Sequence, residues 1–149
     1  MGRQFESDFK HFQKILMKNY LWNMFANINN GQLAKRSFIL QQKKKICEKF
    51  LDVLWNEGFI LGYRNYFQKV KTYKSDTTKI FLKYKNGKPV INTIKPVTKP
   101  GRRVYYTAKQ IWKMNSKNTL LVFSTNKGLK TLNECKNLRI GGELYIILN

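Results

Sequence analysis

Apolar residues recur with helical spacing at two places in the first third of the chain. Residues 20–28 carry them at i, i+3, i+4 and i+7, which predicts a short helix, and Gly31 is expected to end it in the left-handed capping conformation. A longer amphipathic pattern over 42–56 predicts a second helix that ends at Gly58. A short strand is expected between them over 37–40.

Strand patterns dominate the rest of the chain. We expect strands over 59–67, 79–84, 90–97, 119–123 and 143–148, with 73–78 as a polar connection. Asn86-Gly87 predicts a hairpin turn from which 90–97 pairs back, and Pro96 places the end of that segment at a sheet edge. Pro100-Gly101 predicts a type II turn. Residues 109–114 suit a single helical turn, and 131–138 form a short polar segment.

The charge balance changes the picture most. Lys and Arg number 29 against 8 Asp and Glu, which gives a formal net charge of +21, while 42% of residues are hydrophobic. The chain can therefore bury a core, yet its charges repel one another unless a polyanion lies beside them. Nucleic acid is the first candidate and an anionic membrane surface the second, although no apolar run reaches the length of a membrane span.

The sequence offers few residues suited to catalysis or to metal binding. Cys47 and Cys135 lie far apart and His11 is the single histidine, so no metal site or cofactor is expected, and a reducing compartment fits. The stretch FSTNKG over 123–128 carries Ser124, but no GxSxG elbow or nearby base accompanies it, and its glycine placement does not match a P-loop. We expect no catalysis and no small-molecule substrate.

The same stretch suits a surface that contacts RNA. The hydroxyls of Ser124 and Thr125 and the amide of Asn126 can meet base edges and ribose, Lys127 a phosphate, and Gly128 allows close approach. An ordinary polar turn explains the local sequence equally well.

Other basic and glycine-rich clusters belong with it. The triplet Lys43, Lys44 and Lys45 is expected in the first turn of the second helix, where cations oppose the helix dipole and a phosphate would relieve them. A basic turn and a glycine pair complete the candidates, which are Arg102, Arg103 and Tyr105 for phosphate and base stacking, and Gly141, Gly142 and Glu143 before the last strand.

Several motifs in order resemble the small ribosomal subunit protein eight family. They are the NGQ that begins at Asn30, LWNEGFI over 54–60, the hairpin and strand over 81–101, KPGRRVY over 99–105, STNKG over 124–128 and the terminal GGELYIIL. The resemblance runs from about residue 19 to 149. It implies an α+β fold of two small subdomains. The N-terminal one is a helix-strand-helix-strand-strand unit over 19–86, and the C-terminal one is a mostly β unit with short helical turns over 87–149.

The resemblance also implies a function. It indicates a structural protein of the small ribosomal subunit that binds the central domain of small-subunit rRNA. The C-terminal unit would hold the main RNA helix, and the N-terminal unit would touch RNA near Asn30, Gly31 and Lys43–Lys45. The protein five and twelve families are the expected neighbours. A free-standing RNA-binding regulator on the same fold is the alternative.

This chain departs from the family pattern at a basic extension over 1–18, at Asn27 and Asn29 in place of arginines, at Lys130, and over 65–78. With a composition typical of an AT-rich genome, these departures predict an organelle-encoded protein of the mitochondrial matrix ribosome; a plastid or the bacterial cytoplasm is the alternative.

Overall fold

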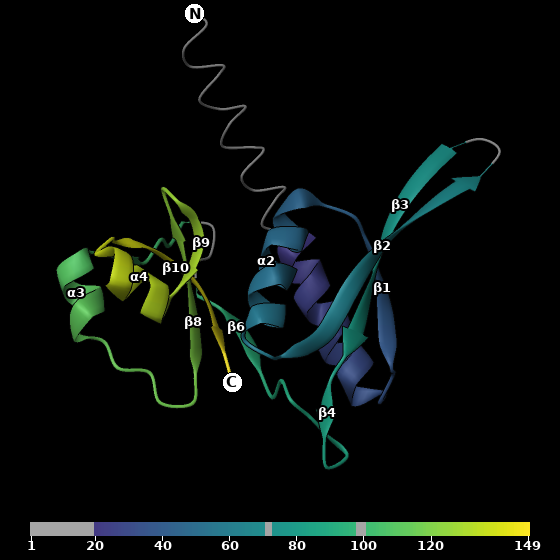
Figure 1. Cartoon of the computed structure of the whole chain (residues 1–149), viewed down its shortest axis with the longest axis horizontal. Helices are drawn as coiled ribbons and strands as arrows, with labels where there is room; N and C mark the ends of the chain where they lie inside the picture. The colour runs from purple at the N-terminus through teal and green to yellow at the C-terminus, as the bar shows by residue number, and fades with distance from the viewer. Residues whose placement is uncertain (1–19, 71–72, 98–100) are drawn as a thin grey trace, which may run out of the picture.

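A computed structural model describes residues 20–70, 73–97 and 101–149 as two units joined through a shared core (Figure 1). The basic extension over 1–18, His11 and Pro100 lie outside the described residues. Both units combine helices with antiparallel strands, so the predicted α+β fold is confirmed.

The N-terminal unit packs two helices on one face of a three-stranded sheet. The first helix is described over 20–33, and α2 spans Lys45–Asn56. The strands are β1 (Phe38–Gln42), β2 (Ile60–Val70) and β3 (Tyr73–Leu82), in the order β1-β3-β2. Figure 1 shows both helices on one side of this sheet, with no described element on the other side.

The first helix ends later than predicted, and α2 begins later than predicted. The first helix continues through Gly31, and Lys35 rather than Gly31 takes the left-handed conformation, with φ 53°. Gly31 instead permits close packing, because a Cβ there would lie 2.5 Å from Ile39 Cγ2. Helix α2 begins three residues later than predicted, since the Lys43 N–H donates to Asp76 O and keeps that residue with the sheet. The predicted end is confirmed, with Gly58 at φ 80°.

The predicted polar connection over 73–78 is wrong, because these residues belong to β3. The β2–β3 pairing runs without a break from Gly62↔Phe81 to Val70↔Tyr73. Inside it, Thr78 is buried and its hydroxyl donates to Asn65 Oδ1 at 2.7 Å. Thr77 and Thr78 are β-branched residues that favour strands, and the pairing partner supplies the hydrogen bonds that a loop would lack.

A small hairpin leads into the C-terminal unit. Strand β4 (Tyr84–Lys85) pairs with β5 (Lys88–Pro89), and the turn residues Asn86 and Gly87 have φ 54° and 75°, which confirms the predicted turn. The predicted pairing of 90–97 with 79–84 is wrong beyond this point. Strand β6 (Ile94–Pro96) pairs with the last strand instead and lies at a sheet edge, as Pro96 predicts.

The C-terminal unit is a sheet with two short helices. Its further elements are β7 (Tyr105–Tyr106), α3 (Ala108–Lys113), β8 (Leu120–Thr125), β9 (Gly128–Thr131), α4 (Leu132–Leu138) and β10 (Gly142–Leu148). The order is β6-β10-β8-β9, and β7 also pairs with β10. The polar segment over 131–138 is thus mostly helical, because Thr131 caps α4 by accepting the Glu134 N–H.

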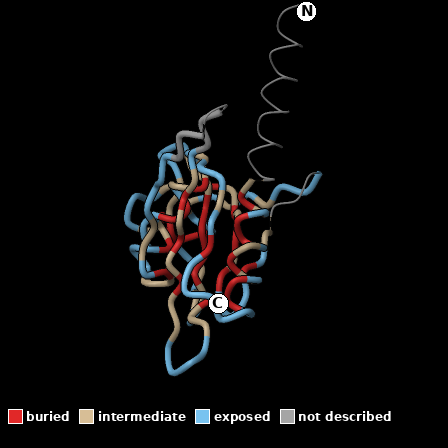
Figure 2. Tube along the Cα trace, turned by 90° about the vertical axis from the view of Figure 1, so that its right-hand side faces the viewer, coloured by how far each residue is buried: buried red, intermediate tan, exposed pale blue. Residues whose placement is uncertain are grey.

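Strand β8 separates two hydrophobic cores. Leu120 and Val122 join a cluster that also contains the N-terminal helices, whereas Leu121 and Phe123 pack with α3 and α4. Buried segments run through the centre of the molecule in Figure 2. Both faces of β8 are thus packed from Leu120 to Phe123, and Ser124, Thr125 and the turn follow directly.

Candidate nucleic-acid interface

The β8–β9 turn is built around the Thr125 hydroxyl. Ser124 and Thr125 are the last residues of β8, and the turn itself consists of Asn126 and Lys127. The Thr125 hydroxyl donates to Gly128 O at 2.8 Å and accepts the Lys127 N–H at 3.2 Å, while Gly128 has φ 99°. Thr125 therefore shapes the turn, and its hydroxyl proton is already engaged. Of the two hydroxyls, that of Ser124 is better suited to meet a ligand.

Three candidate side chains share one row across the sheet. Ser124 lies opposite Glu143 of β10, and Glu143 lies opposite Tyr105 of β7. Ser124 and Glu143 are half-buried, and Tyr105 is 68% exposed. The next residue, Tyr106, packs edge-on against Phe123 with ring centroids 6.3 Å apart. Strand alternation thus sends one tyrosine to solvent and the other to the core.

Two glycines let the surrounding backbone come close. A Cβ on Gly142 would lie 2.8 Å from Ser124 O and 2.8 Å from Thr125 Cγ2, and one on Gly141 would lie 2.7 Å from Tyr106 O. All three distances are shorter than a Cβ contact allows. The glycine pair therefore serves to press β10 against the end of β8 and against the start of α3.

These contacts place the predicted C-terminal residues at one end of one sheet. We call the set of Tyr105, Ser124, Thr125, Asn126, Lys127, Gly128, Gly142 and Glu143 the C-terminal cluster. Exposed Arg102 and Arg103 precede Tyr105 along the chain. Lys130, which the sequence reasoning marked only as a departure, lies 3.7 Å from Glu134 in an i, i+4 ion pair. Its charge thus has a partner inside the protein.

The lysine triplet stands partly outside the helix in which it was predicted. Lys45 is the first residue of α2, and Lys44 is its N-cap, without a side-chain cap hydrogen bond. The Lys44 Nζ lies 4.5 Å from the centroid of the Tyr20 ring, a cation–π contact with the first described residue of the first helix. Lys43 and Lys45 are exposed. In Figure 1 the start of α2 and the β8–β9 turn lie toward the same, upper end of their units.

Asn30 and Gly31 do not join this group. They follow Tyr20 by about ten helical residues, roughly 15 Å at 1.5 Å per residue, so they lie at the opposite end of the first helix from Lys44. Gly31 is buried, whereas Asn30 is exposed. On the same helix, the Asn27 amide donates to Leu40 O at 2.9 Å and to Gln41 Oε1 at 3.0 Å. Asn27 thus links the helix to β1.

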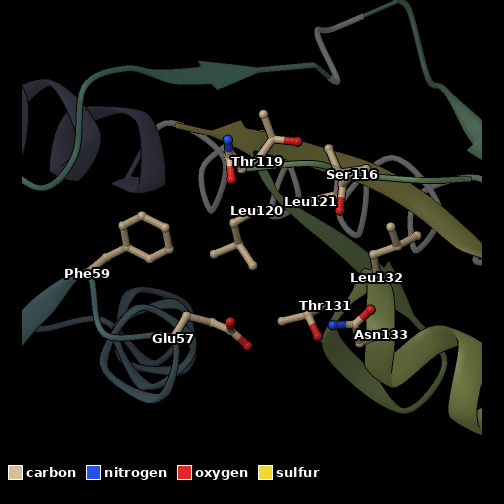
Figure 3. Close-up of a pocket in the computed structure, with 10 residues that line it drawn as sticks. Glu57, Phe59, Ser116, Thr119, Leu120, Leu121, Thr131, Leu132 and Asn133 are labelled. Carbon is tan, nitrogen blue, oxygen red and sulfur yellow. The ribbon is translucent and has the colours of Figure 1, made fainter.

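A cavity of about 290 Å³ lies between the two units (Figure 3). Glu57 and Phe59 line one side, and Ser116, Thr131 and Asn133 are among the residues on the other. Its lining has one carboxylate and no histidine or cysteine, so a general acid–base pair is missing there. The cavity does not contain the C-terminal cluster.

The thiols are equally unsuited to catalysis. Burial raises the pKa of both Cys47 and Cys135 to about 11, so both stay protonated at neutral pH. Within the described ranges, no three His, Cys, Asp or Glu side chains are grouped to hold a metal ion. No helix among these residues is long and apolar enough to cross a membrane.

Comparison with known proteins gives the family. The sequence profile of ribosomal protein S8 matches residues 19–148. The small ribosomal subunit protein uS8 of Erythrobacter litoralis is 34% identical over 128 residues, which cover 86% of this chain and 95% of that protein. The uS8 protein of Alcanivorax borkumensis is 36% identical over 86% of this chain and 95% of its own length. That of Pelagibacter ubique is 34% identical over 82% of this chain and 90% of its own length. The chain therefore belongs to the ribosomal protein S8 family.

Proposed function

We propose that this chain binds folded small-subunit rRNA through the C-terminal cluster and the start of α2. Its family is structural and non-enzymatic, and the chain is a structural protein of the small ribosomal subunit. The observation that carries the proposal is the row Tyr105–Glu143–Ser124, which strand pairing sets beside the β8–β9 turn. It joins an exposed ring, a carboxylate and a hydroxyl at one edge.

The chemistry of the C-terminal cluster suits the shallow minor groove of an RNA helix. There, 2′-hydroxyls and base edges are within reach of short side chains, and a hydroxyl can both donate and accept. Ser124 is in our proposal the group that reads RNA, whereas Thr125 keeps the turn in shape. Glu143 would accept from an amino group of a base, and Tyr105 would stack on an unpaired base or a ribose.

Cations at both units would hold the phosphates. Lys127 extends from the turn, Arg102 and Arg103 precede Tyr105, and Lys43 and Lys45 flank the start of α2. The uncapped N–H groups at that helix start also favour an anion. We retain Asn30 as a separate contact and assign Gly31 a packing role.

The finer assignments are also proposals. We propose residues 19–86 and 87–149 as the two subdomains and residues 1–18 as an extension that contacts RNA or protein. We further propose a mitochondrial ribosome, with members of the protein five and twelve families as neighbours. The basic, divergent segments and an amino-acid composition typical of an AT-rich genome support an organellar origin, while the relatives named above are bacterial.

One experiment tests the RNA-binding role of Ser124. Affinity is measured for an RNA of the central domain of small-subunit rRNA and for a random RNA of equal length. Ser124→Ala should weaken specific binding by about 1–3 kcal/mol and leave random binding unchanged, as loss of a base-edge contact would. Ser116→Ala, a half-buried serine outside the C-terminal cluster, is the matched control. An equal loss on both RNAs would contradict the reading role.

A second experiment separates a ribosomal protein from a free-standing regulator. The tagged chain is followed by sedimentation of ribosomal particles from its own cell at high salt. A structural protein should remain with the small subunit, because many contacts hold it there. Release into the soluble fraction at the salt that removes loosely bound factors would favour the regulator.

A further inference from the structure

The face of the N-terminal sheet that points away from the helices carries aromatic and basic side chains. Strand register places Phe38, Leu40, Arg64, Tyr66, Lys79 and Phe81 on this side, which we call the outer face. Ile39, Ile80 and Leu82 point to the opposite side and are buried. No described element covers the outer face in Figure 1. The sequence reasoning missed this set because its members are separated along the chain.

The aromatic rings gather around one ammonium group. Lys79 Nζ lies 3.9 Å from the ring centroid of Phe38, 5.4 Å from that of Phe81 and 5.9 Å from that of Tyr66. Phe38 is 40% exposed and Tyr66 is 39% exposed. These partly exposed rings beside a cation form a surface that suits a ligand with both a flat face and a negative charge.

The charges on the outer face repel one another. Lys79 lies directly opposite Arg64 in the β2–β3 pairing, and like charges at facing positions destabilise a sheet. The outer face as defined carries no carboxylate. Of the described acids near this sheet, Glu48 and Asp52 bond to Asn65 and Tyr63 on the helix side. Asp76 of β3 lies opposite Phe67, and strand alternation places it on the helix side as well. An external anion would relieve the repulsion between Lys79 and Arg64.

The outer face also has room for a flat group. Gly62 pairs with Phe81, and nothing lies within 4 Å of the position where its Cβ would be. The ring of Phe81 is therefore bordered by open space on one side and by Phe38, its partner in β1, on the other. A planar ring could lie over Gly62 beside Phe81 without displacing a side chain.

We propose that the outer face binds an unpaired, single-stranded RNA segment. Phe38 and Tyr66 stack on bases, while Lys79 and Arg64 hold the phosphates between them. Aromatic rings with interspersed cations on an open sheet are the arrangement that accepts splayed bases, since every base has a face to stack. This site is separate from the C-terminal cluster, to which we assign a folded RNA helix. An acidic protein is the competing occupant, and the aromatic stacking test distinguishes it.

The test uses the full chain and fluorescein-labelled decauridine, which has no stable fold. Binding is followed by anisotropy with excess folded rRNA fragment, which occupies the C-terminal cluster. The double variant Phe38→Leu and Tyr66→Leu keeps apolar bulk and removes both rings. We expect its affinity to fall at least fivefold. Phe67→Leu is the matched control, because Phe67 is the next residue of β2, is 59% exposed and points to the opposite side.

Two further measurements keep the proposal open to refutation if the double variant folds poorly. Lys79→Gln with Arg64→Gln should reduce the salt slope of decauridine binding by about 1.4, since each cation neutralises one phosphate of a single strand. Decamers substituted with 5-iodouridine should crosslink to Phe38 or Tyr66. Unchanged affinity in the ring variants, or equal loss in Phe67→Leu, would overturn the proposal and leave a protein as the occupant. Sedimentation with the small subunit tests the ribosomal role independently.

Discussion

Gly142 offers a sharp test of how the C-terminal cluster is assembled. In Gly142→Ala, the added Cβ would lie 2.8 Å from Ser124 O and 2.8 Å from Thr125 Cγ2. The first of these atoms is backbone in a packed strand, so β10 must move away from the end of β8. Overpacking of this kind costs about 1–3 kcal/mol, against roughly 0.5–1 kcal/mol gained when alanine replaces glycine in a strand.

With about 2 kcal/mol for the overpacking and about 0.75 kcal/mol for the gain, the net expectation is a loss of roughly 1 kcal/mol in the free energy of unfolding. With a urea m-value of about 2 kcal/mol/M, the unfolding midpoint should fall by roughly 0.5 M at unchanged slope. Circular dichroism or tryptophan fluorescence in urea measures it. Because Ser124 and Glu143 face each other at this point, specific RNA binding should weaken as well.

A matched pair separates close packing from backbone conformation. Gly128 has φ 99°, but nothing lies within 4 Å of its would-be Cβ. Asparagine tolerates left-handed conformations, so Gly128→Asn should cost less than about 1 kcal/mol. Gly142→Asn should cost at least as much as Gly142→Ala. If Gly142→Ala left the midpoint unchanged, or if both asparagine variants behaved alike, the close approach would not be the reason for glycine at 142.

Three further predictions follow from contacts elsewhere. Burial raises the thiol pKa of Cys47 and Cys135 to about 11, so a thiol reagent at pH 8 should label neither in the folded chain and both in urea. Between pH 9 and 11 the unfolded chain loses these protons and the folded chain keeps them, so the free energy of unfolding should fall as the pH rises through this range. The Tyr63 hydroxyl donates to Asp52 Oδ1 at 2.5 Å, and burial followed by this bond raises the pKa of Tyr63 to about 12. Tyr63→Phe should cost about 0.5–1.5 kcal/mol in urea unfolding and remove one tyrosine that titrates near pH 12 from the absorbance change at 295 nm. Lys127→Ala and Lys43→Ala should each lower the salt slope of rRNA binding by about one unit, and an unchanged slope would mean that the lysine contacts no phosphate.

Local sequence predicted the parts of the fold that local chemistry decides. The Asn86-Gly87 turn, the glycine that ends α2 and the edge position of Pro96 all depend on φ angles or on a missing N–H, which one or two residues determine. The strand over 73–78 could not be predicted from one or two local residues. Its polar residues become strand because β2 pairs with all of them and β1 also pairs with Thr77 and Thr78.

The same distinction applies to the candidate site. Sequence order brought Ser124, Thr125 and Gly128 together, but only the β10 register places Glu143 and Tyr105 in the same row. It also could not show that the Thr125 hydroxyl is engaged within the turn, since that depends on the position of Gly128 O. Likewise, the helix pattern placed Lys43 in α2, whereas its N–H donates to Asp76 O in β3.

The distribution of acids explains why so much positive charge is left for RNA. Glu48 accepts from Asn65, Asp52 accepts from Tyr63, and Glu134 pairs with Lys130. Two of these three carboxylates thus hold neutral side chains in place and neutralise no cation through those bonds. A formal charge of +21 makes the chain repel itself, and a polyanion beside it would lower that repulsion. In our proposals, the cations of the C-terminal cluster, the start of α2 and the outer face lower this repulsion by contacting RNA phosphates.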